Sequence, residues 1–364
     1  MSKCVWKFMQ WVSLAVVVVF GAGALSAQTR AYVAGTNTDT VQVIDTASNT
    51  VIATIPVGRE PDGVAATSDG AFVYVANKFD STVSVIATAT NTVVATVPVG
   101  SLAIGADIAV APNGLSAYVT RLLANAVDVI DTATNAVIAT VPVGTSPSGV
   151  AVTPNSAFAY VTNISGDTVS VIDTATNAVV ATIPTPGSPR YVAITPDGAF
   201  AYVTSDFADQ VYAIDTATNT VVASIPVASG FGVAFAPNGA SAYVVSSPPG
   251  PGQVVTIDTA TNTVTASAGP TSGRPQRLAV TPDGAFVYVT NELVSRVDVI
   301  DTATNTVATS IVVTGSTHGI AIVGPPPAPP APTNKDQCRD GGWQTFTNPS
   351  FKSQGDCIKY VNHH

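Results

Sequence analysis

The sequence predicts an all-β fold, a seven-bladed β-propeller of four-stranded antiparallel blades. The first observation is a repeated turn, VIDTATN at 171–177, with six close copies along the chain. Its asparagines are separated by 42, 44, 42, 42, 43 and 43 residues, a regular period that indicates a repeat architecture. The second is composition, because 46% of the residues are apolar and only 10% are charged, which is typical of sheets buried on both faces. The turn asparagines are Asn49, Asn91, Asn135, Asn177, Asn219, Asn262 and Asn305.

Each repeat is expected to contain four short strands. In the fourth full unit we place them at 191–195, 201–204, 211–215 and 221–227. Pro196-Asp197-Gly198 predicts a tight turn after the first strand, because proline fixes φ and glycine accepts positive φ. Asn219 closes the turn after the third strand, where asparagine tolerates the left-handed region.

A proline recurs late in the fourth strand of five repeats. Proline cannot donate a hydrogen bond to a neighbouring strand, so it favours the edge of a sheet and blocks pairing with another molecule. The fourth strand is therefore predicted to be the outer edge of each blade. These prolines are Pro56, Pro98, Pro142, Pro184 and Pro226.

The two ends of the repeat region complement each other. The chain after residue 27 opens at a second strand, 31–34, and the last repeat ends with a lone first strand, 319–323. Three N-terminal strands and one C-terminal strand would complete one blade and close the ring. An open solenoid of stacked repeats is the structural alternative.

The repeated strands resemble those of the YVTN-repeat β-propeller family. The matching motifs are AYVTN at 159–163, VYVTN at 287–291 and VYVAN at 73–77, and the resemblance covers about 31–323. It implies a secreted or surface-layer-like propeller, in a family whose activities are diverse. This sequence departs from the family pattern at three places. Ala87 replaces the turn aspartate, Ser68 replaces the turn proline, and SSPPGPG at 246–252 replaces a loop that begins with Asn.

Residues 1–27 read as a secretory signal peptide. Lys3 and Lys7 form a positive start, 12–20 are apolar, and small residues lead to a cut before Gln28. An uncleaved membrane anchor is the alternative, although the apolar stretch is shorter than the roughly 20 residues that a span needs. We therefore expect a secreted, periplasmic or cell-surface protein with no membrane span after cleavage.

Beyond the propeller (28–323), a Pro-rich linker is expected at 324–334 and a small module at 335–364. In an exported protein Cys338 and Cys357 are expected to pair, closing a loop of about 20 residues and stabilising it by roughly 3 kcal/mol. The module resembles a short Cys-Gly-Gly-Trp module appended to other secreted bacterial proteins. It is interpreted either as a wall-contact or adhesion appendage or as a disulfide-stabilised tail without a partner.

The topology divides the loops between two faces. Both repeated turns fall on one face, and the variable loops between second and third strands and between blades fall on the other, so the variable face is the candidate binding face. Residues at the start of the innermost strands should surround the central channel there. Filling the channel end is their alternative role. The candidate ligand-binding residues at this mouth are Asp62, Asp107, Arg190, Tyr191, Phe231, Arg277 and His318.

No motif in the sequence indicates catalysis, a metal site or a cofactor. His318 is the one histidine before His363 and His364, no G-x-S-x-G motif occurs, and the repeated aspartates are expected to cap turns on separate blades. The net charge of −9 argues against nucleic acid as a partner. The sequence therefore predicts a non-enzymatic scaffold that binds a protein or glycan. A lactonase or other propeller hydrolase, with calcium in the channel as a conceivable variant, and a purely structural envelope protein are the alternatives.

Overall fold

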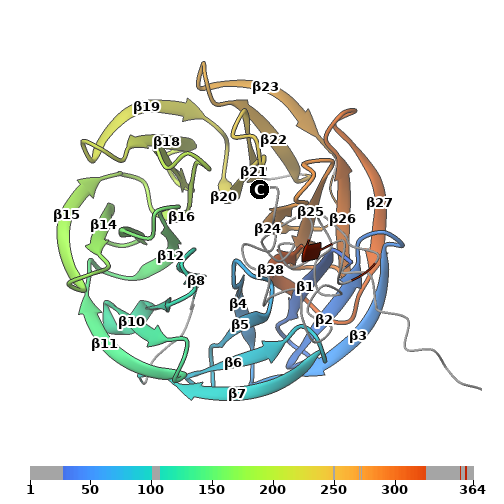
Figure 1. Ribbon diagram of the computed structural model, residues 1–364. Helices are drawn as coiled ribbons and strands as arrows, with labels where there is room; N and C mark the ends of the chain where they lie inside the picture. Colours follow the sequence, from blue (N-terminus) through green and yellow to red (C-terminus); the bar gives the residue numbers. More distant parts are fainter. Residues whose placement is uncertain are drawn as a thin grey trace, which may run out of the picture.

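The computed structural model describes residues 28–100, 107–248, 251–269, 271, 273–324, 353, 357 and 358. Over this part of the chain 28 strands form seven four-stranded sheets. Figure 1 shows the sheets arranged as blades in a ring around a common centre. The predicted seven-bladed propeller is confirmed, and the open solenoid is wrong.

Each blade contains one innermost strand followed by three more toward the outside. Blade 1 contains β28 (Thr317–Val323), β1 (Arg30–Gly35), β2 (Thr40–Asp45) and β3 (Thr50–Pro56). Blade 2 contains β4 (Pro61–Ala66), β5 (Phe72–Asn77), β6 (Thr82–Ala87) and β7 (Thr92–Pro98). Blade 3 contains β8 (Ile108–Val110), β9 (Ser116–Arg121), a 3₁₀ turn η1 (Leu122–Ala124), β10 (Ala126–Asp131) and β11 (Ala136–Pro142). Blade 4 contains β12 (Pro147–Val152), β13 (Phe158–Asn163), β14 (Thr168–Asp173) and β15 (Ala178–Pro184).

The remaining three blades follow the same order. Blade 5 contains β16 (Pro189–Ile194), β17 (Phe200–Ser205), β18 (Gln210–Asp215) and β19 (Thr220–Pro226). Blade 6 contains β20 (Gly230–Phe235), β21 (Ser241–Ser246), β22 (Gln253–Asp258) and β23 (Thr263–Ala268). Blade 7 contains β24 (Pro275–Val280), β25 (Phe286–Asn291), β26 (Arg296–Asp301) and β27 (Thr306–Val312).

Blade 1 closes the ring as the sequence predicts. Its strand order is β28-β1-β2-β3, so one C-terminal strand pairs with three N-terminal strands. The antiparallel register places Tyr32 opposite Ala321. The fourth strands are the outer edges, and the five predicted edge prolines each end one of them.

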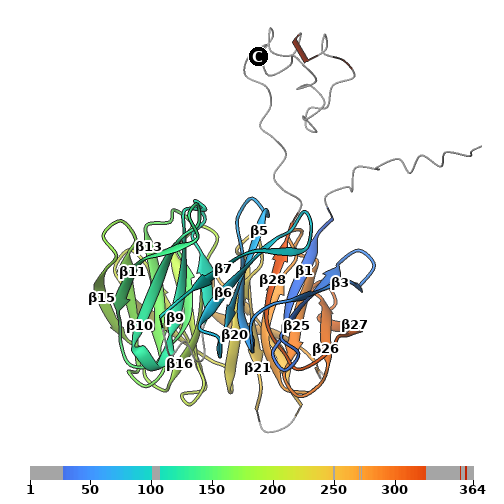
Figure 2. The same cartoon turned by 90° about the horizontal axis from the view of Figure 1, so that it is seen from below.

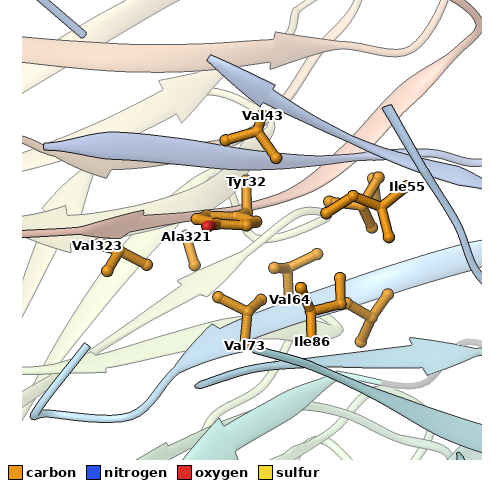
Figure 3. Packing of buried hydrophobic residues seen from close by; sticks show 11 residues of the cluster. Tyr32, Val43, Ile55, Val64, Val73, Ile86, Ala321 and Val323 are labelled. Carbon is orange, nitrogen blue, oxygen red and sulfur yellow. The ribbon is translucent and has the colours of Figure 1, made fainter. Parts of the chain in front are cut away.

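The core consists of layers between neighbouring blades. Figure 3 shows the layer between blades 1 and 2, where the fully buried ring of Tyr32 packs among side chains such as Val64, Val73 and Ile86. A further contact fastens adjacent blades, because the tyrosine hydroxyl donates to the turn asparagine of the next blade, as from Tyr32 to Asn91 at 2.7 Å. This tyrosine–asparagine bond also joins blade 7 to blade 1. The bonded pairs are Tyr32–Asn91, Tyr74–Asn135, Tyr160–Asn219, Tyr202–Asn262 and Tyr288–Asn49.

The repeated turns have the predicted conformations. All seven turn asparagines have φ between 52° and 54°. In the six blades that have an aspartate before the turn, that aspartate caps it, as where the Asp173 carboxylate accepts from the N–H of Thr176 at 2.9 Å; blade 2 has Ala87 there. Gly198 of the Pro-Asp-Gly turn has φ of 77°, as the sequence requires.

The variable and repeated loops lie on opposite faces of the ring. On the variable face, loops of neighbouring blades contact one another, as where Asp39 accepts from the N–H of Glu60 at 2.9 Å. On the repeated-turn face, Ser68 donates to the carbonyl of Pro112 at 2.7 Å. The start of β1 and the end of β28 also lie on that face, at the upper side of Figure 2.

Several predictions fall outside the described residues. These are the signal peptide, the linker beyond Gly324, and nearly all of the C-terminal module, including Cys338. Cys357 is buried and takes part in a disulfide, while its pairing with Cys338 stays a prediction. In the part of the chain that the structure describes, no helix is long and apolar enough to cross a membrane.

Candidate functional site

A β-bulge near the start of the innermost strand creates the mouth of the channel. In blade 2 the pairing shifts between Pro61 and Val64, so Asp62 and Gly63 lie together opposite Ala76. The same shift occurs in every blade except blade 3, where the preceding residues are not described. A bulge places an extra residue in the strand and redirects side chains. Two consecutive residues per blade can thereby surround the channel.

The threonine of the YVTN motif stabilises this bulge. Its hydroxyl accepts from the N–H of the second bulge residue, as from Gly149 to Thr162 at 2.8 Å. The same hydroxyl donates to a carbonyl at the mouth of the next blade, as from Thr162 to Arg190 at 2.7 Å. Thr120 and Thr290 make the equivalent pairs of contacts. The repeated threonine thus fixes the backbone that carries the mouth residues.

Six of the seven predicted residues line one pocket of about 290 Å³ at the mouth, and Asp107 is bonded to one of them. The seven residues occupy two different positions in their strands. The register separates a first bulge position, occupied by Asp62, Arg190, Phe231 and His318, from a second, occupied by Asp107, Tyr191 and Arg277. The bulge is not visible in the sequence, so the two positions could not be distinguished there.

The second bulge position fills the channel. It carries Asp107, Tyr191 and Arg277 in blades 3, 5 and 7 and glycine in blades 1, 2, 4 and 6. Arg277 donates to Asp107 at 2.6 Å from across the ring, and its guanidinium lies 4.3 Å from the centre of the Tyr191 ring. The glycines in the other four blades have no side chain at this position, so they leave room for the three large side chains. These three residues are hereafter called the channel plug, and two of them, Tyr191 and Arg277, line the pocket.

Asp62 is a buried, paired carboxylate at the mouth. It lies 3.0 Å from Lys78 Nζ and 3.3 Å from His318 Nδ1. Burial alone would raise its pKa, but the hydrogen bond with His318 and the charges of Lys78 and Arg277 outweigh burial and hold the pKa well below its usual range. Burial raises the pKa of Asp107, and the charge of Arg277 opposes that shift.

Two arginines converge on Phe231 from neighbouring blades. The guanidinium carbons of Arg190 and Arg274 lie 4.9 and 5.4 Å from the centre of the ring. Arg190 also pairs with Asp206 at 3.1 Å, and Arg274 pairs with Glu292 at 3.1 Å. A cation at this distance from an aromatic face is attracted to the ring, so the Phe231 ring helps to hold both arginines.

Sequence reasoning missed several residues of the pocket. Four of them stand directly after a repeat of the YVTN type, where the second strand ends at the mouth: Lys78, Leu122, Ile164 and Glu292. Their common phase in the repeat was the signal that could have identified them. Arg274 precedes the bulge of blade 7 and had no such signal.

The chemistry available at the mouth is recognition of a polar group. Arginine, lysine, glutamine and a serine face the pocket beside two aromatic rings. Within the described ranges, no group of three or more His, Cys, Asp or Glu side chains is placed to hold a metal ion. The repeated turn aspartates lie on separate blades and cap turns, in agreement with the sequence analysis.

Comparison with known proteins agrees with this architecture. Residues 153–240 match the family model of the YNCE-like beta-propeller, which supports the resemblance drawn from the YVTN motifs. No curated protein matches the chain.

Several solved structures have the same fold. Hydrazine synthase of Kuenenia stuttgartiensis is 26% identical, with a TM-score of 0.61 over 66% of this chain and 76% of that one. A functionally unknown protein of Desulfotomaculum acetoxidans is 20% identical, with a TM-score of 0.71 over 81% of this chain and 99% of that one. A putative 6-phosphogluconolactonase of Bacteroides uniformis is 18% identical, with a TM-score of 0.67 over 81% of this chain and 100% of that one. We conclude that the chain is a seven-bladed β-propeller that is similar, over residues 153–240, to the YNCE-like beta-propeller family.

Proposed function

We propose that the protein is an exported, non-enzymatic binding propeller that holds a protein or glycan partner on its variable-loop face. The support is the convergence of side chains from all seven blades on the one pocket at the mouth. Binding sites commonly lie on variable loops that a rigid scaffold positions. The fold supplies such a scaffold through its closed ring and the bonds between blades.

One observation favours binding over catalysis. The mouth has four acid–base pairs, so its ionised groups already neutralise one another before any ligand arrives. A side chain that serves as a general acid or base near neutral pH needs a pKa near the working pH, whereas Asp62 is held in its ionised form. The pairs are Lys78–Asp62, Arg190–Asp206, Arg274–Glu292 and Arg277–Asp107.

Lactone hydrolysis is a second candidate function, supported by the environment of His318. Its Nδ1 lies 3.3 Å from Asp62, and its Nε2 lies 3.8 Å from Glu292. An imidazole oriented by a buried carboxylate is a common arrangement for a general base. Putative 6-phosphogluconolactonases share the propeller fold, and fold analogy is a weak guide to activity.

The two candidates are separated by parallel assays on the purified propeller. Turnover is measured with glucono-δ-lactone and 6-phosphogluconolactone, and binding is measured on arrays of glycans and of synthetic peptides. We expect no turnover above the spontaneous rate, and array binding that falls in Arg190→Ala and Arg274→Ala. Arg59→Ala is the matched control, because Arg59 lies on the same face in an exposed pair with Asp80. Turnover lost in His318→Ala would favour the hydrolase instead.

Export and tethering belong to the same proposal. The last described residues of β28 lie on the repeated-turn face, so a tail that anchors the protein would leave the mouth directed away from the anchor. Cell fractionation and N-terminal sequencing test this part. We expect the protein outside the cytoplasm with Gln28 as its first residue, and retention of residues 1–27 would contradict signal cleavage.

A further inference from the structure

We propose that the mouth and its surrounding loops form a docking groove for an extended segment of a partner protein. The docked segment carries a carboxylate with apolar side chains on either side of it. The inference rests on the proposed function and narrows its partner to a polypeptide. Two independent features carry it, a set of exposed apolar side chains around the mouth and a pair of accessible arginines inside it.

The first feature is an apolar crown, which consists of Phe79, Leu123, Phe207 and Leu293. These residues are 54%, 52%, 80% and 72% exposed. Each lies in the loop between the second and third strands, in blades 2, 3, 5 and 7. Phe79, Leu123 and Leu293 directly follow a residue that lines the mouth pocket. Large apolar side chains this accessible, repeated around one opening, mark a surface that binds another molecule. Because the crown residues are aliphatic or aromatic, they suit contact with apolar side chains of a partner protein.

The second feature is the uneven burial of the ion pairs. The Arg190 side chain is 31% exposed and its partner Asp206 is 13% exposed. The Arg274 side chain is 46% exposed and Glu292 is 29% exposed. Within each of these two pairs the cation is therefore more accessible to a ligand than its acid, although the whole chain has a net charge of −9. Each guanidinium has five N–H donors. A carboxylate suits it well as an acceptor, because its two oxygens can accept two parallel hydrogen bonds from one guanidinium.

Two adjoining hollows connect the arginines with one residue of the crown, Leu293. A second hollow of about 410 Å³ lies beside the mouth pocket and is lined by Leu293, Pro248 and Ser229. Both hollows share Phe231 and Arg274 as lining residues. A ligand that places a carboxylate at the arginines can thus extend outward to Leu293 of the crown. An extended polypeptide segment has this shape, with alternate side chains available to opposite sides.

The test uses three probes, namely an array of synthetic 12-residue peptides, a glycan array and a fluorescent oligothymidylate. Five forms of the propeller are compared: wild type, Phe207→Ser, Leu293→Ser, the double variant Arg190→Gln/Arg274→Gln, and Leu115→Ser. Leu115 is the matched control, because it is 64% exposed on the repeated-turn face. Circular dichroism confirms that each variant is folded.

We expect wild type to select peptides that carry Asp or Glu next to apolar residues. Each crown variant should weaken this binding about 5- to 10-fold, the arginine variant should weaken it at least 10-fold and remove the preference for acids, and Leu115→Ser should leave it unchanged. Failure to bind peptides overturns the inference, as does a stronger response to glycans or oligothymidylate. Glycan binding that depends on Arg190 and Arg274 would overturn the inference and keep the proposed function, whereas binding that no mouth or crown variant alters would overturn both.

Discussion

The channel plug offers the sharpest test of how the mouth is held together. Arg277 and Asp107 come from blades 7 and 3 and pair across the channel at 2.6 Å, with side chains only 15% and 10% exposed. Replacing Arg277 by alanine leaves the Asp107 carboxylate buried without its cation. Removing one partner of a buried pair costs about 3–5 kcal/mol, and we expect the lower end, about 3 kcal/mol, because some water reaches this site. The lost stacking on Tyr191 is included in that figure.

The pH dependence of this variant has a definite sign. Burial raises the pKa of Asp107 in the folded protein, and without Arg277 only the backbone N–H groups of Ile108 and Val150 oppose the shift. A carboxyl whose folded pKa is raised favours folding while it is protonated, and that contribution is lost as the pH rises through the unfolded and then the folded pKa. The penalty of Arg277→Ala should therefore be larger at pH 7 than at pH 4.

Urea unfolding of four proteins measures the effect: wild type, Arg277→Ala, Asp107→Asn and the double variant. Asparagine keeps an oxygen for the N–H of Val150, which Asp107 accepts at 3.2 Å. The double variant should recover about 2 kcal/mol relative to Arg277→Ala, because the unpaired charge is gone. An Arg277→Ala cost below about 0.5 kcal/mol, or no recovery in the double variant, would refute a structural role for the cross-channel pair.

Three further predictions concern the repeat itself. Tyr288→Phe and Tyr160→Phe should each lower the unfolding free energy by about 1 kcal/mol, because each removes a hydroxyl bond to the next blade. A much larger loss of unfolding free energy for Tyr288→Phe in chemical denaturation would show that the contact between blades 7 and 1 opens separately from the rest of the ring. Hydrogen bonds from the threonine three residues later lower the pKa of Asp131, Asp173, Asp215, Asp258 and Asp301. The stability they add is present above the unfolded pKa of about 4 and is lost as the pH falls, so a variant with asparagine at all five should show a flatter acid limb in thermal melts between pH 5 and 2. Gly319→Ala should cost about 1–3 kcal/mol, because its Cβ would overlap the Asp62 carbonyl, whereas Gly230→Ala, whose nearest neighbour is at 3.4 Å, is the control in the same assay. Equal melting temperatures for the two alanine variants would contradict that contact.

Much of the fold could be predicted because each repeat contains the same residues that favour particular turns and strand ends. The turn asparagines adopt positive φ, the preceding aspartates cap the turns, and the edge prolines end the fourth strands, each for a reason that involves only a few neighbouring residues. Ring closure was also predictable, since the phases of the first and last strands leave only one complete blade to be made from both. The sequence by itself therefore determined the number of blades, their order and the face that carries the variable loops.

The site depended on contacts that no local pattern specifies. The bulge that separates Asp62 from Gly63 is a property of strand pairing, so the sequence did not reveal which of two adjacent residues faces deeper into the channel. Arg277 and Asp107 are 170 positions apart and meet because the ring brings blades 7 and 3 to opposite sides of one channel. The tertiary structure decided which charges neutralise one another and which arginines remain accessible above Phe231. Both depend on distances across the ring and on burial, which the repeat period does not encode.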